Sequence, residues 1–110
     1  TLGKKTIESK DQAGFIVNAL LIPYLTHAIR MFETGFASAE DIDEGMVSGC
    51  GHPMGPLRLC DTVGLDICLA VAESLYAEFG EAHYAPPVLL RRMVDAGYLG
   101  RKTGRGFYEY

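Results

Sequence analysis

The stretch GFIVNALLIPYLTHAIRMF, residues 14–32, decides the fold of this 110-residue chain. Between Phe15 and Leu25 its only strongly polar side chain is that of Asn18. An amphipathic surface helix shows a polar face at the helical period, and this stretch shows almost none over three turns. We therefore predict a long central helix that is covered partly by its own neighbours and partly by something outside this chain.

Asn18 places one carboxamide, with two donors and an acceptor, in this mostly apolar segment. A buried amide without hydrogen-bond partners costs about 1–3 kcal/mol, so we expect Asn18 to be paired. The residues alone leave two interpretations open. Asn18 is either a structural contact between helices, which is the commoner use of a lone buried amide, or a carboxamide directed into a functional cleft.

Turn and cap residues divide the rest of the chain into four shorter helices. Ser38 is a suitable N-cap, Pro56 a suitable first residue, and Asp66 a suitable cap for a later helix. Because the chain shows no β alternation, we predict an all-α domain of about five helices, the first of them bent at Pro23. The expected helices cover residues 15–34, 39–49, 56–63, 67–79 and 88–96.

Composition and charge exclude several classes of protein. The length fits one small domain, and a net charge of −4 argues against general binding of nucleic acid. The three cysteines are odd in number and lack CxxC spacing, which favours free thiols in a reducing compartment over disulfides or zinc. The first ten residues are polar, and the apolar run at 15–25 is too short to span a bilayer. We expect a soluble, cytoplasmic protein with no metal and no membrane contact.

Two glycine-rich segments remain, the loop GCGHPMGP at 49–56 and the tail LGRKTGRGFYEY at 99–110. The loop lacks the Lys-Ser/Thr ending and the preceding strand of a phosphate-binding loop, so a tight interhelical turn is the favoured interpretation. In the tail, closely spaced aromatic residues are expected to pack the chain end onto the helices. The tail's cations are either solvated or bind an anion such as a phosphate.

Taken together, five motifs carry a resemblance to a known family: GFIVN, ASxEDID, GxGxPMGP, DxxGLD and LGxKTGxGFYxY. In this order and spacing they resemble the C-terminal helical domain of 3-hydroxyacyl-CoA dehydrogenases, especially 3-hydroxybutyryl-CoA dehydrogenases. The resemblance covers essentially the whole chain, and the motifs are specific as a set. It implies that residues 14–110 form a substrate-cleft and dimerisation domain. Residues 1–13 would be the remnant of a linker or strand from a missing N-terminal nucleotide-binding domain.

The resemblance also implies an activity in fatty-acid or butanoate metabolism. In the family, the N-terminal domain holds NAD and a His–Glu pair, and the His takes the hydroxyl proton as hydride leaves C3 for the nicotinamide. The helical domain closes the acyl-CoA cleft and forms most of the homodimer interface. Since this chain has neither the glycine-rich dinucleotide fingerprint nor the His–Glu pair, we predict that the isolated fragment is inactive.

Three sets of site residues follow from the resemblance. Asn18 matches the family's catalytic-site Asn, which helps to hold the catalytic His and the substrate oxygen, and this favours the functional interpretation. Lys102 matches a position on the cofactor side of the cleft. The residues implied to line or support the acyl pocket are Met54, the main contact, with Pro53, Gly55 and Pro56. One departure is Ala19, where the family usually has Arg, so an ion pair at an interface is expected to be absent.

Two alternatives stay open beside this enzyme. A non-catalytic structural protein that retained the fold, like the related lens crystallins, would dimerise through the same domain without chemistry. A larger multifunctional fatty-acid oxidation protein would carry such helical domains in tandem, and the end of the chain directly after GFYEY argues against it. The residues upstream of Thr1 discriminate, because a nucleotide fingerprint followed by a His and a Glu supports the enzyme.

Overall fold

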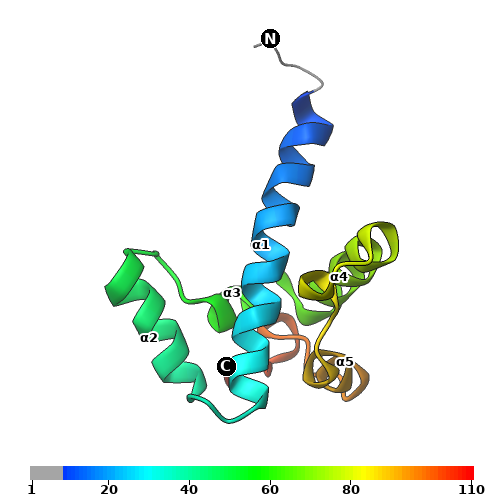
Figure 1. The fold of residues 1–110 in the computed structure, drawn as a ribbon. Helices are drawn as coiled ribbons and strands as arrows, with labels where there is room; N and C mark the ends of the chain where they lie inside the picture. The colour runs from blue at the N-terminus through cyan, green and yellow to red at the C-terminus, as the bar shows by residue number, and fades with distance from the viewer. Residues whose placement is uncertain (1–8) are drawn as a thin grey trace.

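The fold is described by a computed structural model that covers residues 9–110, with side chains from Phe15 onward. It confirms the expected all-α class with five α-helices (Figure 1). Their bounds are α1 Ser9–Glu33, α2 Ala39–Cys50, α3 Pro56–Val63, α4 Leu65–Phe79 and α5 Val88–Asp95, with 3₁₀ turns η1 Ala82–Tyr84 and η2 Arg101–Thr103. In Figure 1, α2 lies on one side of α1 and α4 and α5 lie on the other.

Helix α1 begins earlier than the sequence indicated. Residues 9–13, expected to be strand or linker, form its first turns, so that part of the expectation is wrong. The polar residues there include good helix formers, and the long apolar segment that follows propagates the helix through Gly14 at a cost of about 1 kcal/mol. Residues 1–8, the rest of the expected linker, lie outside the described residues. The helix continues through Pro23 and ends at Glu33, just before Gly35.

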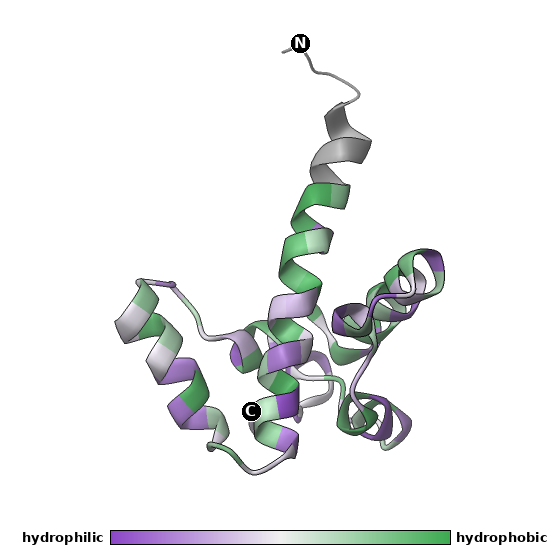
Figure 2. Ribbon diagram, in the orientation of Figure 1, coloured by the Kyte–Doolittle hydropathy of each residue, from purple (hydrophilic) through white to green (hydrophobic). Residues whose placement is uncertain are grey.

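The two halves of α1 have different surroundings. In the C-terminal half, Leu25 and Ile29 are fully buried in the core. In the N-terminal half, the apolar residues Phe15, Ile16 and Leu20 are exposed, and Leu20 is 72% exposed. Figure 2 shows this green half of the helix extending away from the other helices. The segment expected to need cover from outside the chain is therefore the N-terminal half of α1.

One segment of the described chain, Phe15–Glu33, is long and apolar enough to cross a membrane by length and composition alone. This segment is longer than the apolar run at 15–25 because it also includes the more polar residues from Thr26 onward. This is weak support for a membrane span, since the central helix of a soluble protein passes the same test. The polar residues Thr26 and Arg30 in the same segment bind backbone carbonyls of the chain between α4 and α5.

The caps expected from the sequence set most of the other boundaries. The Asp41 N–H donates to Ser38 Oγ at 3.1 Å, which confirms Ser38 as the N-cap of α2. Pro56 is the first residue of α3, as expected. Asp66 is not the cap of α4, because that helix begins at Leu65 after Gly64, and Asp66 stands in its first turn.

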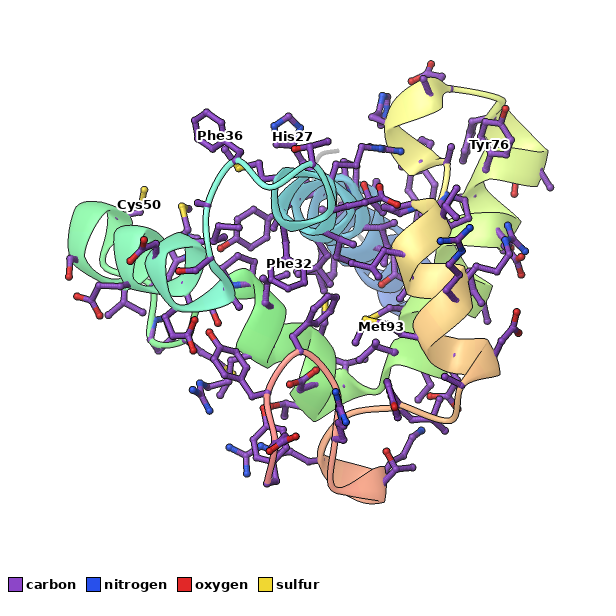
Figure 3. All side chains as sticks on the ribbon, turned by 90° about the horizontal axis from the view of Figure 1, so that it is seen from below. His27, Phe32, Phe36, Cys50, Tyr76 and Met93 are labelled. Atoms are coloured by element: carbon purple, nitrogen blue, oxygen red, sulfur yellow. The ribbon has the colours of Figure 1, made fainter. Side chains whose placement is uncertain are left out.

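The core lies where α1, α3, α4 and α5 meet. Its fully buried side chains come from all four helices and include Leu25, Ile29, Leu57, Leu65 and Leu90. The tail closes this core from one side, since the Phe32 and Phe107 rings meet edge to face with centroids 5.6 Å apart. Figure 3 shows Phe32 directed between α1 and the tail, which confirms the expected aromatic anchoring of the chain end.

Candidate functional site

The tail is held by a buried carboxylate, that of Asp61 on α3, which is 1% exposed. Its Oδ1 accepts the Phe107 N–H at 2.9 Å, and its Oδ2 accepts the Tyr108 N–H at 3.1 Å and the Tyr110 O–H at 2.7 Å. Gly106 packs against this carboxylate so closely that a Cβ there would overlap it. Three donors compensate the cost of burying the charge, so Asp61 fixes the path of the last four residues.

A second buried carboxylate, that of Asp43 on α2, fixes the start of α3. Its Oδ1 accepts the Leu57 N–H at 2.8 Å, and its Oδ2 accepts the Arg58 N–H at 3.0 Å. These are free amides of the first helical turn, so Asp43 caps α3 from a neighbouring helix. The Tyr108 O–H also donates to Oδ2 at 2.6 Å, which connects the tail to α2.

The two tyrosines that complete these sites are held in their protonated form, which donates the hydrogen bond. Burial, and then the hydrogen bond to Asp43, raises the pKa of Tyr108 well above its ordinary value of 10. Burial, and then the hydrogen bond to Asp61, raises the pKa of Tyr110 to about 12. Both hydroxyls therefore stay protonated in the folded chain at pH values where they ionise in the unfolded chain.

This difference predicts an alkaline loss of stability. A pKa raised by folding contributes stability that is complete below the unfolded value of about 10 and is lost as the pH rises through the folded value. We expect the free energy of unfolding to fall between pH 10 and pH 12, and Tyr110→Phe to show a smaller fall. Urea titrations at several pH values measure the free energy of unfolding. Tyr76→Phe, at an exposed tyrosine of α4, is the control. If Tyr76→Phe reduced the alkaline fall in stability as much as Tyr110→Phe, the assignment to Tyr110 would be contradicted.

The loop between α2 and α3 contacts α1 through a tyrosine–histidine pair. The Tyr24 hydroxyl lies 3.0 Å from His52 Nδ1, and the two rings meet edge to face. His52 is half-buried although it belongs to a glycine-rich loop. The reason is Tyr24, which lies 28 residues away in sequence.

An open apolar groove of about 440 Å³ separates α1 from this loop. Its walls include Val17, Leu20, Leu21 and Tyr24 from α1 and Pro53 and Met54 from the loop. Asn18 lies on the same helical turn as Val17 and Leu21 and is half-buried. The predicted residues Pro53 and Met54 therefore line this groove, whereas Asn18 is not part of its lining.

A larger apolar groove, of about 600 Å³, lies between α1 and α2 and shares Tyr24 with the first groove. Phe36, 75% exposed, stands on it beside His27, and Figure 3 shows both side chains pointing outward at the same edge. Pro56 lines this second groove, whereas Gly55 is packed against Asp43. Of the four residues expected at the acyl pocket, Gly55 and Pro56 thus support the start of α3 and do not line the first groove.

Residues 14–110 match the sequence model of the family described as the C-terminal domain of 3-hydroxyacyl-CoA dehydrogenase. The chain belongs to this family.

Named relatives agree with this assignment. The chain is 59% identical over 99% of its length to 3-hydroxybutyryl-CoA dehydrogenase of Mycobacterium tuberculosis and 46% identical over its whole length to that of Clostridioides difficile. The crystal structure of M. tuberculosis FadB2 matches 86% of the chain with a TM-score of 0.85 and 61% identity. That of the (S)-3-hydroxybutyryl-CoA dehydrogenase PaaH1 from Ralstonia eutropha matches 86% with a TM-score of 0.84 and 56% identity.

The dehydrogenase domain is only a part of these proteins. It spans 38% and 39% of the two sequence relatives and 33% and 34% of the two chains of known structure. More than half of each relative therefore lies outside the segment that this chain matches.

In the dehydrogenase domain, Lys102 lies outside both apolar grooves. Its Nζ lies 2.7 Å from Asp66 Oδ1 at the start of α4, and neither of the two grooves is lined by it. The hydrogen bond from Lys102 is the main reason that the pKa of Asp66 is lowered. This ammonium is thus already paired with a carboxylate, and its contact with a cofactor stays a prediction.

Sequence reasoning missed Asp43 and Asp61, the two acids that hold the dehydrogenase domain's loop and tail. One signal was available, because Asp43 follows Ala39 and Ile42 on the apolar face of α2. Over the residues described, no three His, Cys, Asp or Glu side chains are grouped as metal ligands would be. The two acids therefore have the contacts of structural residues, with backbone amides and tyrosine hydroxyls as partners.

Proposed function

We propose that this chain is the substrate-cleft domain of an NAD-dependent dehydrogenase that acts on short-chain 3-hydroxyacyl-CoA, such as 3-hydroxybutyryl-CoA. One observation carries the proposal: the chain is 59% identical over 99% of its length to a protein named 3-hydroxybutyryl-CoA dehydrogenase. The geometry adds support, since the groove of about 440 Å³ between α1 and the loop has apolar walls that include the predicted Pro53 and Met54. Such an apolar groove suits the hydrocarbon part of an acyl chain.

The chemistry of this chain is limited to binding and orientation. Asn18 is a donor and acceptor that holds a substrate oxygen or a catalytic side chain, and the groove holds the acyl carbons. When bound, NAD supplies the hydride acceptor. Lys102 is the predicted contact of this chain with NAD, and its ammonium is paired with Asp66 when the cofactor is absent. We place the cofactor and the catalytic His and Glu on the part of the protein outside this chain.

The exposed apolar surface supports two protein partners. Phe15, Ile16 and Leu20 leave the N-terminal half of α1 uncovered, next to Asn18. Burying such side chains stabilises an interface by about 25 cal/mol per Å². We assign this half to the nucleotide-binding domain. The groove beside Phe36 we assign to a second copy of the chain, which gives a homodimer.

These assignments imply a cytoplasmic enzyme of fatty-acid or butanoate metabolism. The three cysteines are free thiols, as in proteins of a reducing compartment. The uncovered apolar half of α1 contacts protein and not lipid, because a carboxamide at Asn18 is costly in a hydrocarbon environment without a partner.

The proposal is tested by comparing the isolated 110 residues with the full-length protein. We expect the full-length protein to oxidise 3-hydroxybutyryl-CoA with NAD and the isolated chain to be inactive, because the groove alone lacks the cofactor and the general base. NADH absorbance measures the rate. A full-length protein that does not oxidise this substrate would refute the proposal, and so would significant turnover by the isolated chain. Light scattering on the full-length protein tests the homodimer.

A further inference from the structure

Tyr24 and His52 connect the two walls of the groove between α1 and the 52–54 loop. The Tyr24 hydroxyl lies 3.0 Å from His52 Nδ1, and the ring centroids lie 5.5 Å apart at an interplanar angle of 71°. In the neutral tautomer with its proton on Nε2, His52 accepts this hydrogen bond at Nδ1. The pair is therefore the polar connection between the helical wall of the groove and the loop wall.

The loop is held at both of its ends. At one end, Asp43 binds the first amides of α3, and Gly55 packs against the Asp43 side chain without room for a Cβ. At the other end, Tyr24 holds His52. Only Pro53 and Met54 lie between these two points, and the proline ring restricts the backbone further. The position of Met54 relative to α1 thus depends on the two attachments.

The opposite wall is rigid. Val17, Leu20 and Leu21 belong to the continuous helix α1, whose backbone is fixed by its own hydrogen bonds. A change in the width of the groove therefore requires movement of the loop. Of the two ends, the Asp43 end consists of buried, charge-assisted hydrogen bonds, whereas the His52 end has the bond between the half-buried Tyr24 and His52 side chains and a backbone bond from the His52 N–H to the Met46 carbonyl at 3.3 Å. The weaker attachment lies directly beside the groove.

We infer that Tyr24 is a positioning residue that holds Met54 close to α1 through its hydrogen bond to His52 and so limits the length of the acyl chain in the groove. This inference rests on the proposed function, in which the groove holds the acyl carbons of the substrate. Loss of the bond frees the 52–54 segment to move outward. Longer acyl chains then gain room, while the Asp43 end keeps α3 in place.

The test compares 3-hydroxyacyl-CoA substrates of four, six and eight carbons with the full-length enzyme and its Tyr24→Phe variant. This change keeps the ring and its packing and removes only the hydroxyl. We expect the ratio of kcat/KM for the six-carbon substrate to that for the four-carbon substrate to rise between about twofold and tenfold, the effect of one hydrogen bond. The change is expected as a lower KM for the longer substrates with kcat unchanged, whereas a merely structural defect would lower kcat for all substrates alike.

Two variants of His52 sharpen the test. His52→Leu removes the acceptor and should reproduce the shift of Tyr24→Phe, with no further shift in the double variant. His52→Asn keeps an acceptor oxygen near the position of Nδ1 and should retain the original chain-length ratio. Tyr76→Phe, at an exposed residue of α4 that does not line the groove, is the matched control and should change neither the chain-length ratio nor the rate.

The outcomes separate the inference from the proposed function. If the unmodified enzyme oxidises 3-hydroxybutyryl-CoA but Tyr24→Phe leaves the chain-length ratio unchanged, the positioning role is refuted and the function stands. If His52→Asn shifts the ratio as far as His52→Leu does, the hydrogen bond is not the cause and the inference also fails. If the unmodified enzyme oxidises none of the three substrates, the proposed function itself is overturned.

Discussion

In the full-length enzyme, we expect Asn18→Ala to lower kcat for 3-hydroxybutyryl-CoA by roughly 100-fold, the usual cost of removing one positioned donor at a reacting oxygen. Asn18 is half-buried and belongs to the half of α1 that extends beyond the other helices. Ala is also the better helix former, so the substitution should not destabilise α1. Steady-state kinetics measure the rate, and light scattering verifies that the oligomeric state is unchanged.

Two further variants make the Asn18 result specific. Asn18→Asp keeps the size but replaces the amide donors with acceptors, and we expect it to be nearly as slow as Asn18→Ala. Ser74→Ala, at an exposed polar residue of α4, is the control and should leave kcat unchanged. Unchanged kinetics in Asn18→Ala would return this residue to the structural interpretation, in which the amide only joins helices.

The second large effect concerns stability. We expect Asp61→Ala to lower the free energy of unfolding by about 3–5 kcal/mol, because it leaves two backbone amides and the Tyr110 hydroxyl without an acceptor in a buried site. Small domains have only about 5–15 kcal/mol of stability in total, so the variant should lose much of its folded population on mild heating. Thermal and urea denaturation measure the loss.

The local cause can be separated from a general weakening of the fold. Amide hydrogen exchange at Phe107 and Tyr108, whose N–H groups both bind Asp61, should increase most in Asp61→Ala. Asp95→Ala removes an exposed carboxylate at the end of α5 and should change stability by less than about 0.5 kcal/mol. Protected tail amides in a stable Asp61→Ala protein would show that the carboxylate does not hold the tail.

Local signals were sufficient for most helix boundaries. Ser38, Pro56 and Gly80 each act through their own backbone conformation or a partner three or four residues away, so the printed sequence contains what is needed to place them. The start of α1 was missed for the opposite reason. Residues 9–13 have no apolar periodicity, and their helical state follows from the long segment that they precede.

The site was predictable only in part, because its geometry depends on contacts between distant residues. Asn18 stands out as a lone amide in an apolar run, whereas Asp43 and Asp61 resemble ordinary helix-surface acids until their donors are known. The partners of Asp43 are 14, 15 and 65 positions away, and no local pattern indicates them. The same holds for His52. Its partner Tyr24 is 28 positions away, and the two meet only because the loop packs against α1.

The tail contacts have a consequence for synthesis of the protein. Asp43 and Asp61 acquire their full sets of donors only when residues 107–110 are in place, since Tyr108 serves both carboxylates and Tyr110 serves one. In a nascent chain whose helices α1 to α5 have already left the ribosome, the two carboxylates still lack donors from the tail, and burying them would be unfavourable. Completion of the native packing must therefore wait for the synthesis of residues 107–110, and until then Phe32 of α1 lacks the Phe107 ring that packs against it.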